Sequence, residues 1–136
     1  MSTVLIFDNS PRSRFDLSNT LFAEGHNVVE ATNRSDALLW VERATPDLVL
    51  LDLADHTAGG WSVLEDIRRN PRTRFMPVVT VLSPFTHRFD LVRARLLGIT
   101  DSVVIPWDAE DLATRVNWAL WWSVWNLEAA LPPAVR

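Results

Sequence analysis

The sequence predicts a doubly wound α/β domain, in which one five-stranded parallel sheet carries helices on both faces. Short apolar, β-branched runs alternate with helix-length segments along the whole 136-residue chain, as in folds that are built from βαβ units. The central run, residues 46–52 (PDLVLLD), is uniformly apolar in its middle, which is typical of a strand buried on both faces of a sheet. The connections are short, so we expect right-handed crossovers between neighbouring units.

The first unit begins with residues 3–8, an aliphatic strand that ends in an aspartate. Ser10 followed by Pro11 is typical of a helix N-terminus, because serine caps the first turn and proline fits the first helical position. We expect this helix to stop near Gly25. A short strand, residues 27–31, follows it.

The next two units surround the central strand. Ser35 is expected to cap a helix that ends near Ala44. Residues 46–52 then form the third strand, and a glycine pair breaks the loop after it. We expect the third helix over residues 61–69, because an Asn-Pro pair that cannot continue a helix follows.

The last two units repeat the pattern. Residues 77–83 are a β-branched strand, and a helix over about 86–97 ends at Gly98. Residues 102–105 form the fifth strand, and a last helix runs over about 108–127.

The bulk properties of the chain limit its organisation and partners. We expect one domain over residues 1–127 and a C-terminal tail over 128–136, where two prolines oppose a helix. The net charge of −4 argues against nucleic acid as the main partner. The sequence has neither a leader pattern nor an apolar run of membrane-spanning length, so we expect a cytoplasmic location and no membrane partner.

The chain lacks both cysteine and lysine, and each of these absences excludes a class of site. The chain has no cysteine, which excludes disulfides and thiolate metal sites. All 13 basic residues are arginine, so phosphate loops and Schiff-base sites that need a lysine ammonium are excluded as well.

Two aspartates mark the expected functional edge of the sheet. Asp8 and Asp52 each end an apolar strand. In the flavodoxin-like strand order 2-1-3-4-5 these strands are neighbours, so both carboxylates meet at the carboxyl edge, where open α/β sheets bind ligands. Clustered carboxylates usually bind a hard divalent cation. The plainer alternative is that both residues only cap loops and helix N-termini.

Several motifs resemble the response-regulator receiver domain of two-component signalling, over about residues 3 to 121. They share the family's order and spacing, and they are residues 4–9, residues 46–52 with Gly60 after them, residues 70–74 leading into Pro77, Leu97-Gly98, and Pro106.

The resemblance implies a phosphorylation site. Asp52 would be the phosphoacceptor, which receives a phosphoryl group from a histidine kinase or phosphotransfer protein. Asp8, Asn9, Asp52 and the carbonyl of Ala54 would hold Mg²⁺, and the metal would neutralise the phosphoryl oxygens. The bond before Pro106 would be cis.

The chain also departs from the family pattern. Ile105 occupies the position of the family's lysine, and Asn9 replaces an acidic residue, which weakens the expected Mg²⁺ site. The switch hydroxyl falls on Leu82 by direct count, or on Ser83 if the fourth strand has one extra residue. Two interpretations stay open: a degenerate receiver that is weakly or never phosphorylated, and a working phosphoacceptor with unusual parts.

The last helix has two apolar faces at helical spacing. One face should dock on the sheet, and it consists of Leu112, Val116, Ala119, Leu120 and Leu127. The other lies roughly 150° away, and we call it the tryptophan stripe: Trp118, Trp121, Trp122 and Trp125. Either the helix bends so that the stripe covers the core rim, or the stripe is an interface for a homodimer or a hydrophobic protein partner.

The predicted function is a stand-alone receiver-like signalling domain of a two-component or phosphorelay system. Its output would be protein–protein contact, and we expect no catalytic activity of its own. The alternative is a phosphorylation-independent scaffold or dimerisation module with a vestigial acidic pocket. A metal-dependent phosphatase is disfavoured, because the chain offers no lysine to position.

Overall fold

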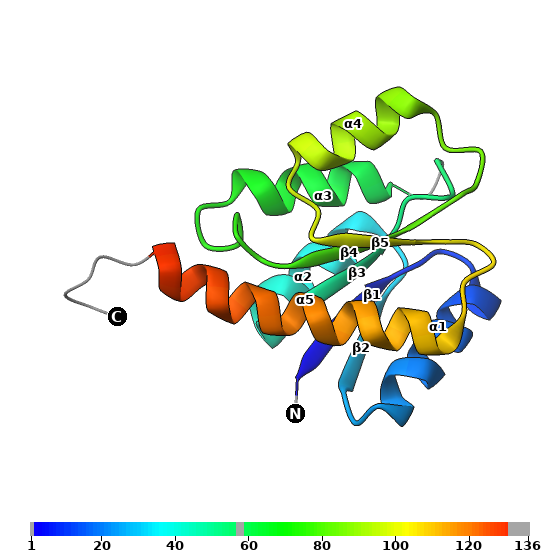
Figure 1. The fold of residues 1–136 in the computed structure, drawn as a ribbon, viewed down its shortest axis with the longest axis horizontal. Helices are drawn as coiled ribbons and strands as arrows, with labels where there is room; N and C mark the ends of the chain where they lie inside the picture. Colours follow the sequence, from blue (N-terminus) through cyan, green and yellow to red (C-terminus); the bar gives the residue numbers. More distant parts are fainter. Residues whose placement is uncertain (1, 57–58, 131–136) are drawn as a thin grey trace.

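The sheet has the predicted architecture (Figure 1). The computed structural model describes residues 2–56 and 59–130, with side chains as far as Trp125. All strand pairs are parallel, and the order is β2-β1-β3-β4-β5. The strands are β1 (Thr3–Phe7), β2 (Asn27–Ala31), β3 (Leu48–Asp52), β4 (Val78–Leu82) and β5 (Asp101–Val104).

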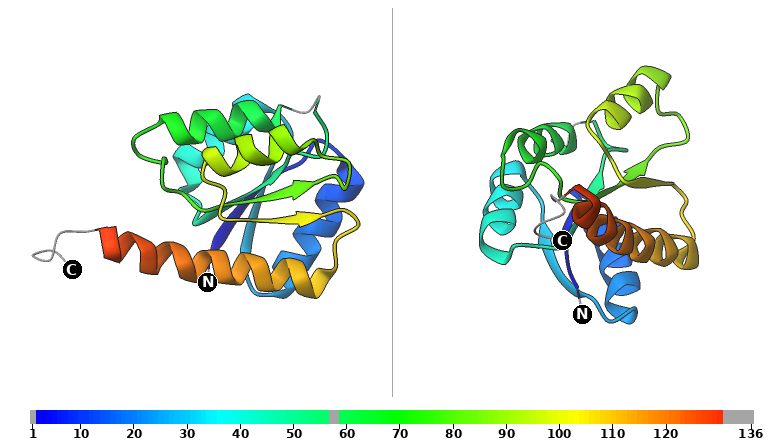
Figure 2. Two further views of the ribbon diagram at one scale, coloured as in Figure 1. Left: turned by 45° about the horizontal axis from the view of Figure 1, so that its top comes forward. Right: turned by 60° about the vertical axis from the view of Figure 1, so that its left-hand side comes forward.

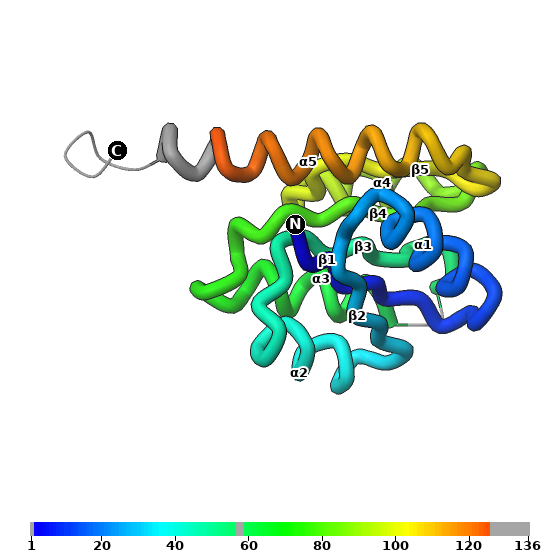
Figure 3. Tube along the Cα trace, turned by 90° about the horizontal axis from the view of Figure 1, so that it is seen from below, coloured from blue at the N-terminus to red at the C-terminus, as the bar shows by residue number. Residues whose placement is uncertain are grey.

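Helices cover both faces of this sheet, as expected of a doubly wound fold (Figure 2). They are α1 (Pro11–Ala23), α2 (Arg34–Ala44), α3 (Gly60–Arg69), α4 (Arg88–Leu96) and α5 (Ala109–Ala130). Helices α1 and α5 pack on one face, and α2 and α3 pack on the other. Figure 3 shows α5 and α2 on opposite sides of the domain. In the described part of the chain, no helix is long and apolar enough to cross a membrane.

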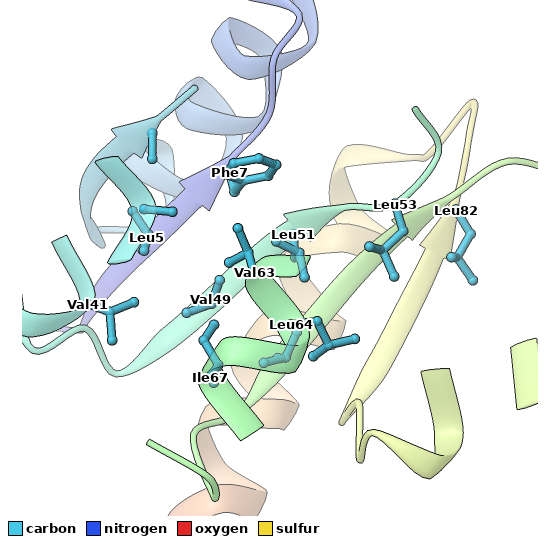
Figure 4. Packing of buried hydrophobic residues seen from close by; sticks show 13 residues of the cluster. Leu5, Phe7, Val41, Val49, Leu51, Leu53, Val63, Leu64, Ile67 and Leu82 are labelled. Atoms are coloured by element: carbon cyan, nitrogen blue, oxygen red, sulfur yellow. The ribbon is translucent and has the colours of Figure 1, made fainter. Parts of the chain in front are cut away.

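Two core clusters sandwich the sheet, because successive side chains of a strand point to opposite faces. In β3, Val49 and Leu51 pack with α2 and α3, whereas Leu48 and Leu50 pack with α1 and α5. Figure 4 shows the first cluster, in which Leu51 lies against Val63 of α3. Every residue of β3 is buried, which confirms the two-sided burial predicted from its sequence.

Most helix ends follow the sequence signals, and one predicted cap is wrong. Ser10 caps α1, with Pro11 in its first turn. Asn33, not Ser35, caps α2: its Oδ1 accepts from the backbone N–H of Asp36 at 2.8 Å, and Ser35 already lies in the first turn. Asparagine caps a helix about as well as serine does, so Asn33, which comes first in the chain, can begin the helix.

Helix α4 begins later than the expected residue 86, because residues 83–86 form a turn in which Thr86 N–H donates to the Ser83 carbonyl. Its cap is His87, whose Nδ1 accepts from the N–H of Phe89 at 3.2 Å. Helix α5 continues to Ala130, beyond the expected end near residue 127. The expected tail, 128–136, therefore begins inside the helix, and residues 131–136 lie outside the described residues.

The docking face of α5 is confirmed by burial. Leu112, Val116 and Ala119 are fully buried against the sheet, and Leu120 packs at the edge of the same cluster. The side chain of Leu127 is outside the described part of the chain. In Figure 1 the last turns of α5 project beyond the sheet.

Candidate functional site

The fold brings Asp8 and Asp52 together at the carboxyl edge of the sheet. Strands β1 and β3 are paired with Phe7 opposite Leu51, so Asp8 leaves β1 where Asp52 ends β3. Asp8 is completely buried, and Asp52 is 7% exposed. Two buried carboxylates on neighbouring strand tips form an acidic pocket.

Burial raises the pKa of Asp52 to about 6, since a carboxylate loses hydration in this pocket. The charges of Asp8 and Asp55 raise this pKa further. The backbone N–H groups of Ala54 and Asp55 oppose the rise, and the N–H of Ala54 donates to Oδ1 of Asp52 at 2.9 Å. A positive charge in the pocket would therefore stabilise the charged form of Asp52.

The first turn of α1 holds Asp8 in place. The N–H of Ser10 donates to Oδ1 of Asp8 at 2.9 Å, and the hydroxyl of Ser13 donates to Oδ2. Arg14 Nη1 donates to the backbone carbonyl of Asp8 at 2.9 Å. Our sequence reasoning missed Ser13, Arg14 and Asp55 as parts of this site. In the sequence, Pro11 indicates that a helix begins shortly after Asp8. The first turn of that helix, which contains Ser13 and Arg14, therefore lies next to the tip of β1.

Gly60 explains how closely α3 approaches the pocket. A Cβ atom at this position would lie 2.3 Å from the backbone oxygen of Asp52. Only glycine permits this contact, and it fixes the start of α3 directly behind the acidic residue.

The donor set fits a small hard cation. Among the described residues, no three His, Cys, Asp or Glu side chains cluster closely enough to hold a metal by themselves. Mg²⁺ needs fewer, because it keeps several waters and usually takes one or two carboxylates. Asp8 and Asp52 supply these, while Asn9 is exposed beside Asp8 and Ala54 follows Asp52 by two residues. All four candidate ligands offer oxygen.

The structure distinguishes the two candidates for a switch hydroxyl. Leu82 is 4% exposed and belongs to the core cluster under α3. Ser83 is half-buried just beyond β4, and its Oγ accepts from the N–H of Phe85 at 3.1 Å. Of the two positions, only Ser83 carries a hydroxyl, and its role as a switch stays a prediction.

Ile105 lies where the resemblance places a lysine, directly after β5. Its N–H donates to the carbonyl of Leu82 at 2.9 Å, and its side chain is 38% exposed. The bond between Ile105 and Pro106 is cis, as the resemblance implies. An aliphatic side chain at this place brings no positive charge to the pocket.

The tryptophan stripe is a separate surface on α5. Its four side chains are between 39% and 59% exposed, so a large part of each ring faces away from the core. The rings stack in two pairs: Trp118 with Trp122 at 5.6 Å between centroids, and Trp121 with Trp125 at 6.1 Å. The stripe is therefore an exposed aromatic surface of two stacked pairs.

Comparison with known families agrees with this geometry. The model of the response regulator receiver domain matches residues 4–117. The chain belongs to this family.

Receiver-domain relatives differ in how much of their length the chain covers. Protein PilH of Pseudomonas aeruginosa is 28% identical over 117 residues, which are 86% of this chain and 96% of PilH. Protein-glutamate methylesterase/protein-glutamine glutaminase 1 of Myxococcus xanthus is 35% identical over 106 residues, 76% of this chain but only 30% of that protein. The crystal structure of a putative response regulator from Chloroflexus aurantiacus has a TM-score of 0.79 at 22% identity, covering 88% of this chain and 97% of that one. That likeness supports the fold alone.

Proposed function

We propose that the protein acts as a receiver in two-component or phosphorelay signalling, with Asp52 as the phosphoacceptor. The observation that carries this proposal is the burial of Asp52 beside Asp8 at the carboxyl edge, where burial raises the pKa of Asp52 to about 6. A carboxylate oxygen of Asp52 attacks the phosphorus of a phosphohistidine on a histidine kinase or phosphotransfer protein. The P–N bond breaks, and the imidazole leaves with the electron pair and takes up a proton.

The chain's own residues position the acceptor. Ser10 and Ser13 fix the carboxylate of Asp8, and the N–H of Ala54 orients Oδ1 of Asp52. Mg²⁺, when held by Asp8, Asn9, Asp52 and the Ala54 carbonyl, supplies the positive charge that neutralises the phosphoryl oxygens. Asn9 in place of a carboxylate weakens this site.

The phosphorylated state is expected to be stabilised less than in receivers with a lysine. Ile105 cannot contact a phosphoryl oxygen, which leaves Ser83 as the residual hydroxyl near the strand ends. We expect signal output through protein–protein contact at the tryptophan stripe, and no independent catalysis.

The phosphoacceptor is tested by adding Mg²⁺ with beryllofluoride, or with acetyl phosphate, and recording ¹H–¹⁵N spectra. The amide of Ala54 should shift, because its N–H donates to Asp52. The shift should disappear in Asp52→Ala and persist in Asp16→Ala, an exposed aspartate on α1. Silence of the wild-type protein at millimolar Mg²⁺ would favour the scaffold function instead.

The second candidate, a phosphorylation-independent scaffold or dimerisation module, is favoured by Ile105 together with the exposed stripe. Four tryptophans can supply much of the roughly 800 Å² per partner of a standard interface. Trp121→Glu with Trp125→Glu should convert a homodimer to a monomer in light scattering, while Leu39→Glu with Trp40→Glu on α2 should not. Unchanged mass in the stripe variant would count against a homodimer through α5.

A further inference from the structure

An arginine-lined groove lies at the opposite edge of the sheet from the acidic pocket. Its volume is about 780 Å³, and its lining includes Pro46, Pro77 and Thr100, which precede β3, β4 and β5. The connections that precede β4 and β5 and the C-terminal half of α5 form its walls. Neither phosphoryl transfer nor the metal site uses this groove.

Most of the lining is apolar, and three guanidinium groups add positive charge. Phe75, Met76 and Ile99 are among its apolar residues, and Arg68, Arg72 and Arg74 are its arginines. The one lining carboxylate, Asp47, accepts from the N–H of Thr3 through its Oδ2 at 2.8 Å, and the three arginines outnumber it. The groove therefore combines an apolar surface with positive charge.

Ion pairs with carboxylates are formed by some arginines of the described residues and not by others, and Arg12, Arg43, Arg88 and Arg95 outside the groove form none. Elsewhere, five arginines form ion pairs with carboxylates: Arg14, Arg34, Arg69, Arg93 and Arg115. Among the described residues, no ion pair joins a carboxylate to any arginine of the groove. Arg72 and Arg74 are exposed, and Arg74 lies over the ring of Phe75 at 4.7 Å, so this aromatic surface is capped by a cation.

The groove is continuous with the tryptophan stripe. Trp122 belongs to the stripe and also lines the groove, together with Val124. A partner that covers the stripe would therefore also contact the groove arginines beside it. Negative charge on that part of the partner would favour binding, and positive charge would oppose it.

We infer that the groove and the stripe together bind a segment of a protein partner in which apolar side chains stand next to carboxylates. Carboxylates match the exposed Arg72 and Arg74, whereas Arg68 already donates to backbone carbonyls. Apolar side chains match Phe75, Met76 and Trp122. Nucleic acid fits less well, because the lining is mainly apolar and the net charge of the chain is −4. The inference extends the output surface of the proposed function, but binding here does not require phosphorylation of Asp52.

The test is calorimetric titration of the unphosphorylated, Mg²⁺-free protein with two synthetic peptides. One is an amphipathic helix with leucine and phenylalanine on one face and glutamate on the other, and its counterpart has glutamine for glutamate. The glutamate peptide should bind more tightly, and Arg72→Glu with Arg74→Glu should weaken it about tenfold, through two lost ion pairs and new repulsion. The matched control, Arg12→Glu with Arg88→Glu, carries the same charge change outside the groove and should stay within about twofold.

Four results would overturn the inference. The two peptides could bind equally, or the groove variant could bind like the control. A single-stranded oligothymidine could bind more tightly than the glutamate peptide, which would assign the surface to nucleic acid. The groove variant could change the sedimentation of the protein alone, which would make a second copy the occupant. Asp52→Ala should bind the peptide like the wild type, so failure of the phosphoacceptor and failure of the groove are distinguishable.

Discussion

The two edges of the sheet each bury a charge, and they do so with opposite sign. At the carboxyl edge Asp52 lies beside another carboxylate, and burial raises its pKa to about 6. At the other edge burial lowers the pKa of the Arg68 guanidinium, and no carboxylate in the described part of the chain pairs with it. Asp52 can lose its charge by binding a proton near neutral pH, whereas an arginine stays charged.

The difference follows from the direction of the chain. In a parallel sheet with crossover helices, helix N-termini lie at the carboxyl edge and helix C-termini at the other. Backbone N–H groups therefore surround Asp52, and backbone carbonyls surround Arg68. Arg68 donates to the carbonyls of Leu97, Gly98, Arg74 and Met76 at 2.6 to 3.1 Å. The fold thus makes one edge structurally fixed and leaves the other able to bind a proton near neutral pH.

The largest expected effect is at the fixed edge. Arg68→Met keeps the apolar stem but leaves several carbonyls without a donor, so we expect the free energy of unfolding to fall by about 3 kcal/mol. Urea unfolding followed by far-UV circular dichroism measures it. The neighbouring Arg69→Met removes only an exposed ion pair with Glu65 and should cost less than about 0.5 kcal/mol. Equal losses in the two variants would show that the carbonyl contacts of Arg68 add no stability.

At the responsive edge, stability should depend on pH through Asp52. Its pKa is higher in the folded than in the unfolded chain, so the folded state binds the proton more tightly, and stability falls as pH rises from about 4 to about 6. Asp52→Asn should remove this loss and raise the free energy of unfolding by about 2 kcal/mol at about pH 7.5, with little gain at about pH 4. Thermal unfolding at both pH values measures it. A gain of the same size at both would attribute the effect to packing instead of charge.

The carboxyl edge was largely predictable from the sequence. Apolar runs ending in aspartate predicted the strands, and the flavodoxin-like strand order expected for them made Asp8 and Asp52 neighbours at this edge. The contributions of Ser13 and Asp55 were not predictable, because they depend on how the first turn of α1 and the loop after β3 fold back over the strand tips.

The groove was beyond sequence reasoning for a different reason. Arg68, Arg72 and Arg74 look like an ordinary solvated helix end when only their spacing is known. The role of Arg68 depends on Leu97 and Gly98, which are distant in the sequence. Only the strand order brings their carbonyls within hydrogen-bond distance of Arg68. Periodicity identified the tryptophan stripe, but not its junction with this groove at Trp122.

The smallest expected effect comes from giving the acidic edge a fixed cation of its own. Ile105→Lys places an ammonium at the end of β5, two strands from Asp52. An opposite charge near a carboxylate lowers its pKa, so the pH-dependent loss of stability should shrink by about 1 kcal/mol relative to Ile105→Met. Ile105→Met controls for side-chain length without charge, and thermal unfolding across the same pH range measures the difference. If the two variants respond alike to pH, a charge at position 105 does not reach Asp52, and replacing lysine there cannot be what weakens the phosphorylated state.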